Sequence, residues 1–124
     1  MQTFSKNERL CGKTTIDNLF TNGRSIKDPL FRLVWNTKEF DNETIAKTLI
    51  VVPKKNIKNA VNRNVLKRRM KEAFRIYKSA LYTKIKSKNQ QLAIAIIYQG
   101  QEILPYKAIE EKIKLILGRL SEEI

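Results

Sequence analysis

The segment "KNAVNRNVLKRRMKEAFR", residues 58–75, carries seven basic side chains and a single acid, Glu72. On a helix of about 3.6 residues per turn, its apolar side chains fall on one arc and most of its basic ones on the neighbouring arc. The apolar arc consists of Leu66, Met70, Ala73, Phe74 and Tyr77. This pattern predicts a helix over about residues 59–78 that packs by one side and presents a basic stripe on the other, with Lys78 included in the stripe.

The stripe is poorly balanced by acids. Like charges recur at i, i+4 in Arg63/Lys67, Lys67/Lys71 and Lys71/Arg75, and each such pair costs a few tenths of a kcal/mol. Glu72 is spaced to pair with Arg68 and Arg69. Ten basic residues and one acid lie between Lys54 and Lys78, which accounts for nine of the thirteen net positive charges. We interpret the stripe as a polyanion-binding surface rather than a solvated face.

Composition supports a single domain over residues 1–124 with a nucleic-acid partner. The chain is 42% hydrophobic and carries a formal net charge of +13, which opposes compaction unless a polyanion binds. The N-terminus lacks an apolar segment of signal-peptide length, and the longest apolar runs are strand-sized. Cys11 is the only cysteine. We therefore expect a cytoplasmic protein with no membrane association.

The residues that most often perform hydrolytic chemistry are missing from the sequence. It contains no histidine, the usual acid–base catalyst and metal ligand. None of its twelve carboxylates stands in a metal-binding spacing such as D-x-D. We expect no catalytic residue and no metal site on the protein itself.

Periodicity along the chain predicts the order α-β-β-β-α-β-α. We expect a helix at about residues 14–22, a brief strand at 24–27, a strand after Pro29, and the run "IAKTLIVVP" (45–53) as a strand in the centre of the sheet. The basic helix, with a further turn or two after it, leads to the strand "QLAIAIIYQG" (91–100), and a last helix starts near Pro105. Ala93 and Ala95 would let a helix approach that strand closely. The order fits an α/β (α+β) two-layer sandwich with a small mixed sheet of about four strands.

At these residues the sequence resembles a known family, the protein subunit of bacterial ribonuclease P. The family's signature reads approximately V-S/A-K-K, a short link, then A-x-x-R-N-R-x-K-R-x-x-R-E-x-F-R, and "VVPKKNIKNAVNRNVLKRRMKEAFR" (51–75) follows it. The resemblance extends to "TFSKNERL" (3–10) and "LFTNGRS" (19–25). This sequence departs from the family pattern at three positions: Val65 replaces the third residue of Arg-Asn-Arg, Pro53 precedes the lysine pair, and Ile16 stands where an aromatic is common.

The resemblance implies a fold with a left-handed β-α-β crossover and a function in tRNA maturation. Such a protein binds the catalytic RNA of ribonuclease P and the 5′ leader of precursor tRNA, and so assists endonucleolytic removal of the leader. The RNA would supply the active site and hold most of the magnesium. No obligate protein partner is expected.

Carried over by position, the resemblance assigns two surfaces. The residues expected to bind the catalytic RNA are Arg63, Asn64, Lys67, Arg68, Lys71 and Arg75. Those expected to bind the leader and precursor tRNA are Phe20, Arg32, Val34, Lys54, Lys55 and Asn59. For Phe20, its i+4 spacing from Ile16 supports core packing as well as a leader contact, whereas Trp35 is expected in the core.

Two other functions share the charge pattern. A ribosome-associated structural RNA-binding protein would have similar size and basicity. A DNA-binding module would place the basic helix in a major groove, but no second helix stands at helix-turn-helix spacing. Charge alone does not separate RNA from DNA as the partner, whereas the family motif favours RNA.

Overall fold

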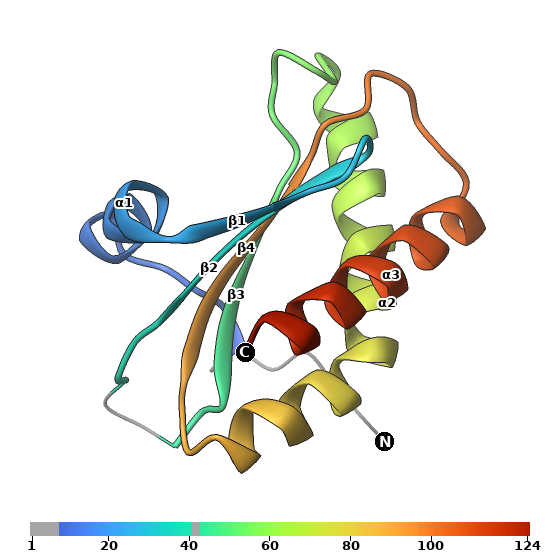
Figure 1. Ribbon diagram of the computed structural model, residues 1–124. Coiled ribbons are helices and arrows are strands. Elements are labelled where there is room, and N and C mark those ends of the chain that lie inside the picture. The colour runs from blue at the N-terminus through green and yellow to red at the C-terminus, as the bar shows by residue number, and fades with distance from the viewer. Residues whose placement is uncertain (1–7, 41–42) are drawn as a thin grey trace.

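A computed structural model of the chain describes residues 8–40 and 43–124 (Figure 1). Its elements follow the predicted order. They are α1 (Lys13–Asn22), β1 (Arg24–Lys27), β2 (Phe31–Thr37), β3 (Ala46–Val51), α2 (Ala60–Ser87), β4 (Leu92–Tyr98) and α3 (Tyr106–Glu123). The helix predicted over residues 59–78, with a further turn or two, is a single continuous helix as far as Ser87. The "TFSKNE" part of the N-terminal resemblance lies outside the described residues, except for Glu8.

The four strands form one mixed sheet in the order β1-β2-β4-β3. β1 pairs antiparallel with β2, and β2 pairs antiparallel with β4. β3 runs parallel to β4. Since parallel neighbours need a crossover connection, α2 forms the link in a β-α-β unit. The predicted α+β architecture with a small mixed sheet is confirmed.

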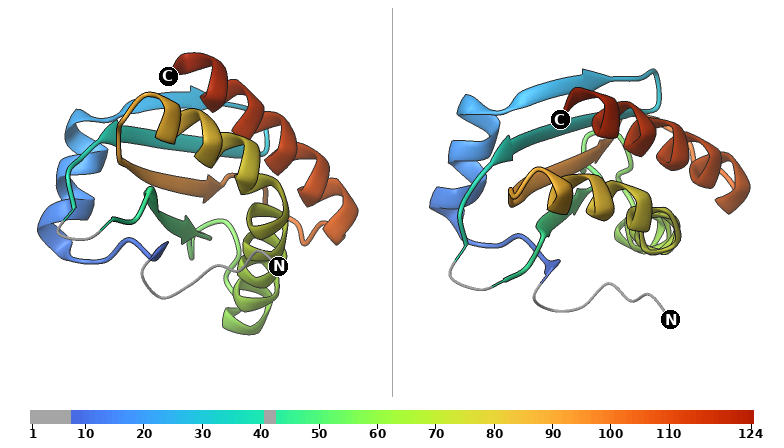
Figure 2. Two further views of the ribbon diagram at one scale, coloured as in Figure 1. Left: turned by 90° about the horizontal axis from the view of Figure 1, so that it is seen from below. Right: turned by 60° about the horizontal axis from the view of Figure 1, so that its bottom comes forward.

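The main core lies between the sheet and the two long helices. α2 and α3 both cover the same sheet face, as the two views of Figure 2 show. Alternate strand residues point into this core, including Leu33, Ile94 and Ile96, each with no exposed surface. Trp35 belongs to the same cluster, which confirms the expectation that it is a core residue.

A second, smaller core holds α1 on the opposite sheet face. Leu19 packs there with Val34, Ala93 and Ala95. The two alanines lie beneath α1, as the alternation of large and small residues in β4 predicted. This cluster also includes Leu10, which precedes the helix.

One expectation about the sheet is wrong, because β3 is an edge strand and β4 occupies the centre. The burial of β3 alternates between buried and half-buried residues, whereas β4 is buried at six of seven positions. The outer edge of β3 meets the N-terminal segment, where Leu10 N–H donates to the Thr48 carbonyl at 3.0 Å and Arg9 bridges to Thr48. The apolar character of "IAKTLIVVP" reflects this covered edge and the burial of Val52 beyond the strand.

Gly23 is required by close approach at the turn from α1 into β1. Its φ of −76° is open to any residue, but a Cβ at this position would collide with the Leu19 carbonyl oxygen and come within 2.8 Å of Val34 Cγ1. We therefore predict that Gly23→Ala lowers the free energy of unfolding by about 1–3 kcal/mol, as overpacking does.

Urea denaturation would measure this effect, with Gly118→Ala as the matched control. Gly118 lies on the exposed side of α3 with open space around it. Alanine there should stabilise the protein by about 0.5–1 kcal/mol, because glycine is a poor residue inside a helix. A loss of stability in both variants would contradict the steric explanation for Gly23.

Candidate nucleic-acid interface

The basic helix begins at a capped N-terminus. The Asn59 side-chain oxygen accepts the backbone N–H groups of Val61 at 2.8 Å and Asn62 at 3.2 Å, and this satisfies two of the free donors of the first turn. Asn59 was predicted to contact the leader, a role that stays a prediction. The structure shows that its oxygen is engaged in starting α2.

Arg63 joins the first turn of α2 to the residues just before the helix. Its guanidinium donates to the carbonyls of Ile57 at 3.0 Å and Lys58 at 2.8 Å. The turn at residues 54–56 presents Lys54 and Lys55 to solvent. Arg63 thus fixes the short link between the exposed lysine pair and the start of the basic helix.

The basic stripe is formed by Asn64, Lys67, Arg68 and Lys71 on one side of α2. Asn64 and Arg68 are exposed, and the two lysines are half-buried at their stems. Within the described part of the chain, no carboxylate forms an ion pair with Lys67, Arg68 or Lys71. The pKa of Lys71 is lowered by its partial burial and by the positive charges of Arg9 and Lys67. The stripe therefore carries an unneutralised positive potential.

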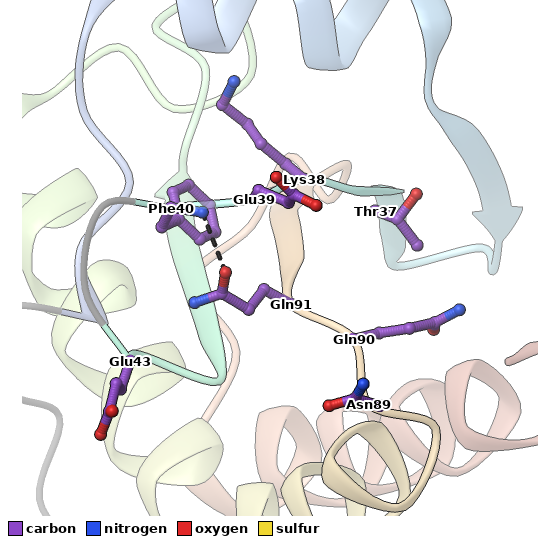
Figure 3. A pocket seen from close by; sticks show the side chains of 8 residues that line it. All are labelled: Thr37, Lys38, Glu39, Phe40, Glu43, Asn89, Gln90 and Gln91. Atoms are coloured by element: carbon purple, nitrogen blue, oxygen red, sulfur yellow. Dashed lines mark hydrogen bonds between the residues drawn. The ribbon is translucent and has the colours of Figure 1, made fainter.

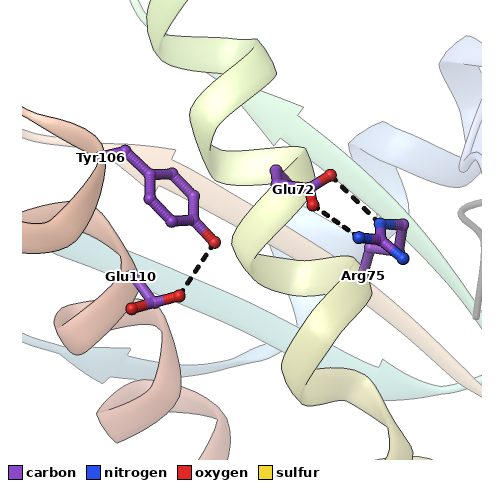
Figure 4. A network of polar contacts seen from close by, with 4 residues as sticks. All are labelled: Glu72, Arg75, Tyr106 and Glu110. Atoms are coloured by element: carbon purple, nitrogen blue, oxygen red, sulfur yellow. Dashed lines mark hydrogen bonds and ion pairs between the residues drawn. The ribbon is translucent and has the colours of Figure 1, made fainter.

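Glu72 pairs with Arg75, not with Arg68 or Arg69 as the spacing suggested (Figure 4). Arg75 Nη2 contacts Glu72 Oε1, and Arg75 Nε donates to Oε2 at 3.1 Å. The hydrogen bond from Arg75 lowers the pKa of Glu72. Arg69 points to the other side of α2, where it donates to the Leu104 carbonyl and supports the link into α3. Arg75, predicted to bind RNA, thus has its charge balanced within the protein.

Lys78 also differs from expectation, because it is withdrawn from the stripe. It is 5% exposed, and its ammonium group forms an ion pair with Glu8 at 2.7 Å. Val65, the departure from the Arg-Asn-Arg motif, is half-buried and adds no charge. The stripe left for a ligand is therefore shorter than the sequence pattern suggested.

The predicted leader-binding residues come from three places. Arg32 and Val34 lie in β2 on the sheet face that α1 partly covers, Phe20 lies in α1 itself, and the remaining three stand between β3 and α2, namely Lys54, Lys55 and Asn59. Phe20 is 37% exposed while its neighbour Leu19 is buried, which favours the ligand-facing role of Phe20 over core packing. Arg32 is half-buried and its Nη2 donates to Ser25 Oγ at 3.2 Å. Val34 is only 1% exposed in the small core. It supports α1 from below and has no surface to offer a ligand, so direct leader contact through its side chain is not possible in this structure.

A polar pocket of about 690 Å³ lies apart from these residues, between the β2–β3 connection and the turn from α2 into β4 (Figure 3). Gln91 spans it, accepting the Phe40 N–H at 2.9 Å and donating to the Thr44 carbonyl at 2.6 Å. Its charged lining combines Lys38 with the acids Glu39 and Glu43. This mixture gives no preference for an anionic ligand.

The mixed four-stranded sheet and the one-sided basic helix define a small α+β protein with a surface that favours a polyanion. Comparison with known families identifies one family over nearly the whole chain. The family model described as Ribonuclease P matches residues 4–121, and the chain belongs to this family. Members are the protein components of ribonuclease P, and maturation of tRNA 5′ ends is the function of the family. That membership removes the support for the DNA-binding and ribosome-associated alternatives.

Individual relatives agree with the family assignment. The ribonuclease P protein component of Chlorobium phaeobacteroides is 31% identical, over 98% of this chain and 92% of the relative. That of Porphyromonas gingivalis is 26% identical, over 97% of this chain and 88% of the relative. Among solved structures, the RNase P protein of Staphylococcus aureus superimposes with a TM-score of 0.73 at 20% identity, covering 91% of this chain and 94% of that one. The RNase P protein of Thermotoga maritima superimposes with a TM-score of 0.67 at 23% identity, covering 90% of this chain and 96% of that one.

The structure also bears on membranes, since none of the described helices is long and apolar enough to span one.

The capping role of Asn59 can be separated from ligand binding. We predict that Asn59→Ala destabilises the protein by about 1 kcal/mol because the first turn of α2 loses its cap. Asn59→Asp, which keeps an accepting oxygen, should retain stability. Thermal or urea unfolding measures both variants, with Asn64→Ala as a control on the exposed side of the same helix. Equal losses in Asn59→Ala and Asn64→Ala would contradict a specific capping effect.

Proposed function

We propose that this protein binds the catalytic RNA of ribonuclease P through the stripe of Asn64, Lys67, Arg68 and Lys71. The carrying observation is that Lys67, Arg68 and Lys71 stand on a helix docked by its other side, without acidic partners among the described residues. Phosphate groups are the ligands that such a stripe attracts, with release of counterions from the RNA. Arg68 adds a planar fork that can hold a phosphate at two points.

In this proposal the chemistry of phosphodiester hydrolysis takes place on the RNA subunit, which holds most of the magnesium. Two features of the chain support this division. The sequence has no histidine, and within residues 8–40 and 43–124 no three side chains of the metal-binding types gather. The protein's own contribution is to bind and orient two RNA molecules.

The substrate surface is proposed to comprise Phe20, Arg32, Lys54 and Lys55. An exposed aromatic ring can stack on any base, and nearby cations can follow a single-stranded backbone without sequence preference. This suits a leader whose sequence differs from one precursor tRNA to another. Val34 takes part only as the support for α1.

Reconstitution tests the proposal as a whole. The purified protein, mixed with its cognate ribonuclease P RNA at low magnesium concentration, should increase the rate of precursor-tRNA cleavage over that of the RNA alone. The physical reason is that bound cations offset the phosphate repulsion that magnesium would otherwise screen. No increase, with both components shown to be folded, would contradict the proposed function.

The two surfaces can be distinguished by Arg68→Ala and Phe20→Ala. Arg68→Ala should weaken binding to the catalytic RNA by about tenfold, in line with the loss of a charge-assisted hydrogen bond. Phe20→Ala should leave that affinity unchanged and weaken binding of leader-bearing substrate by about 1–3 kcal/mol, the value of one stacked base.

Filter binding or fluorescence anisotropy with precursor and mature tRNA measures the difference. Mature tRNA, which has no leader, serves as the control ligand, and Phe20→Ala should leave the holoenzyme's affinity for it unchanged. If both variants affected both measurements equally, the assignment of two separate surfaces would be wrong.

A further inference from the structure

The segment of residues 8–10, termed here the N-terminal strap, is fixed to α2 by a nearly buried polar cluster. The Glu8 carboxylate receives hydrogen bonds from Lys78 Nζ at 2.9 and 2.7 Å and from the Tyr82 hydroxyl. The side chains of Lys78 and Glu8 are only 7% and 13% exposed. A buried pair of this kind is strongly destabilising to break, because either partner alone would be an unpaired charge.

The strap is fixed to the sheet as well. The Leu10 N–H donates to the Thr48 carbonyl at 3.0 Å, and the Leu10 side chain is 4% exposed in the small core beneath α1. Between these two anchored residues, Arg9 bridges to Thr48 through its backbone and remains exposed. Its backbone position is therefore set on both sides, while its side chain is available to a ligand.

This arrangement places Arg9 beside the basic stripe. Lys71 and Lys78 are seven residues apart on one side of α2, about two turns, so the strap that holds Lys78 lies along the same side as Lys71 and Lys67. The positive charge of Arg9, after the partial burial of Lys71 itself, helps to lower the pKa of Lys71. Among the described residues, no carboxylate pairs with Arg9, Lys67 or Lys71.

We propose that Arg9 is a further contact for the catalytic RNA, where it joins Lys67 and Lys71 in binding backbone phosphates at the junction between α2 and the edge of β3. The inference rests on the proposed function in that its partner is the same RNA, but it adds a second segment of the chain to the surface. Glu8 neutralises Lys78, which the sequence pattern had placed in the stripe, and the next residue, Arg9, supplies an exposed cation. Three cations without an acid favour phosphates, and the arginine fork allows a two-point contact.

The experiment compares Arg9→Ala, Arg9→Lys and Lys86→Ala in binding to the cognate ribonuclease P RNA over a range of salt concentrations. Lys86 is also an exposed cation and lies in the last turn of α2, far along the helix from the stripe. Arg9→Ala should lower affinity by roughly threefold to tenfold and reduce the slope of log K against log salt by about 0.7–0.9, the value of one phosphate contact. Arg9→Lys should keep the wild-type slope, and Lys86→Ala should change neither quantity by more than about twofold.

Unfolding midpoints identify any variant whose fold has changed, and none is expected because the Arg9 side chain is exposed. An Arg9→Ala affinity within about twofold of wild type would overturn the inference, as would an equal loss in Lys86→Ala. So would an effect on precursor-tRNA binding alone, which would move Arg9 to the substrate surface. Arg68→Ala is measured in parallel. If it weakens RNA binding and Arg9→Ala does not, only this inference fails; if the wild-type protein does not bind the RNA, the proposed function fails with it.

Discussion

The packing of α2 against the sheet and α3 buries three of its side chains fully, Leu66, Met70 and Phe74. This contact sets the position of the basic stripe on α2 and of the N-terminal strap that is anchored to the same helix. Each such side chain contributes about 1.5–3 kcal/mol when it leaves water, which is enough to hold the repelling cations on the opposite side of the helix. The same helix forms the crossover between β3 and β4, and a connection of this kind allows the two strands to lie side by side in parallel.

The cations that remain available to a ligand are decided by a few specific pairings within the protein, and the overall composition does not reveal them. Four cations of α2 are engaged by other groups of the protein, Arg63 and Arg69 by backbone carbonyls, Arg75 by Glu72 and Lys78 by Glu8. Of the cations left to face a ligand, Lys67, Arg68 and Lys71 stand close together in the first half of the helix, whereas Lys84 and Lys86 lie apart from them in its last turn. Because the paired cations are neutralised, the positive potential of the helix is concentrated at the cations that have no acidic partner.

The sequence predicted what depends on local periodicity, and missed what depends on distant partners. The apolar arc of α2, the small residues of β4 and the order of elements all follow from patterns within one segment. The edge position of β3 did not, since an apolar run looks the same whether a strand or the N-terminal strap covers its edge. Glu72 had three cations within one turn, and spacing alone did not choose among them. Lys78 finds Glu8 seventy residues away in the chain, a contact that only the tertiary fold creates.

The hydrogen bonds from Arg63 to the carbonyls of Ile57 and Lys58 have a consequence for the spacing between the two RNA-binding surfaces. The exposed lysine turn ends directly before these two residues, so the path of the chain from the lysine pair to the first turn of α2 is short and held by hydrogen bonds. Under the proposed function, these parts touch different RNA molecules. The hydrogen-bonded link then reduces the conformational entropy that is lost when the second RNA binds. Two backbone carbonyls, through their hydrogen bonds to Arg63, thus help to set the spacing between the bound substrate and the catalytic RNA.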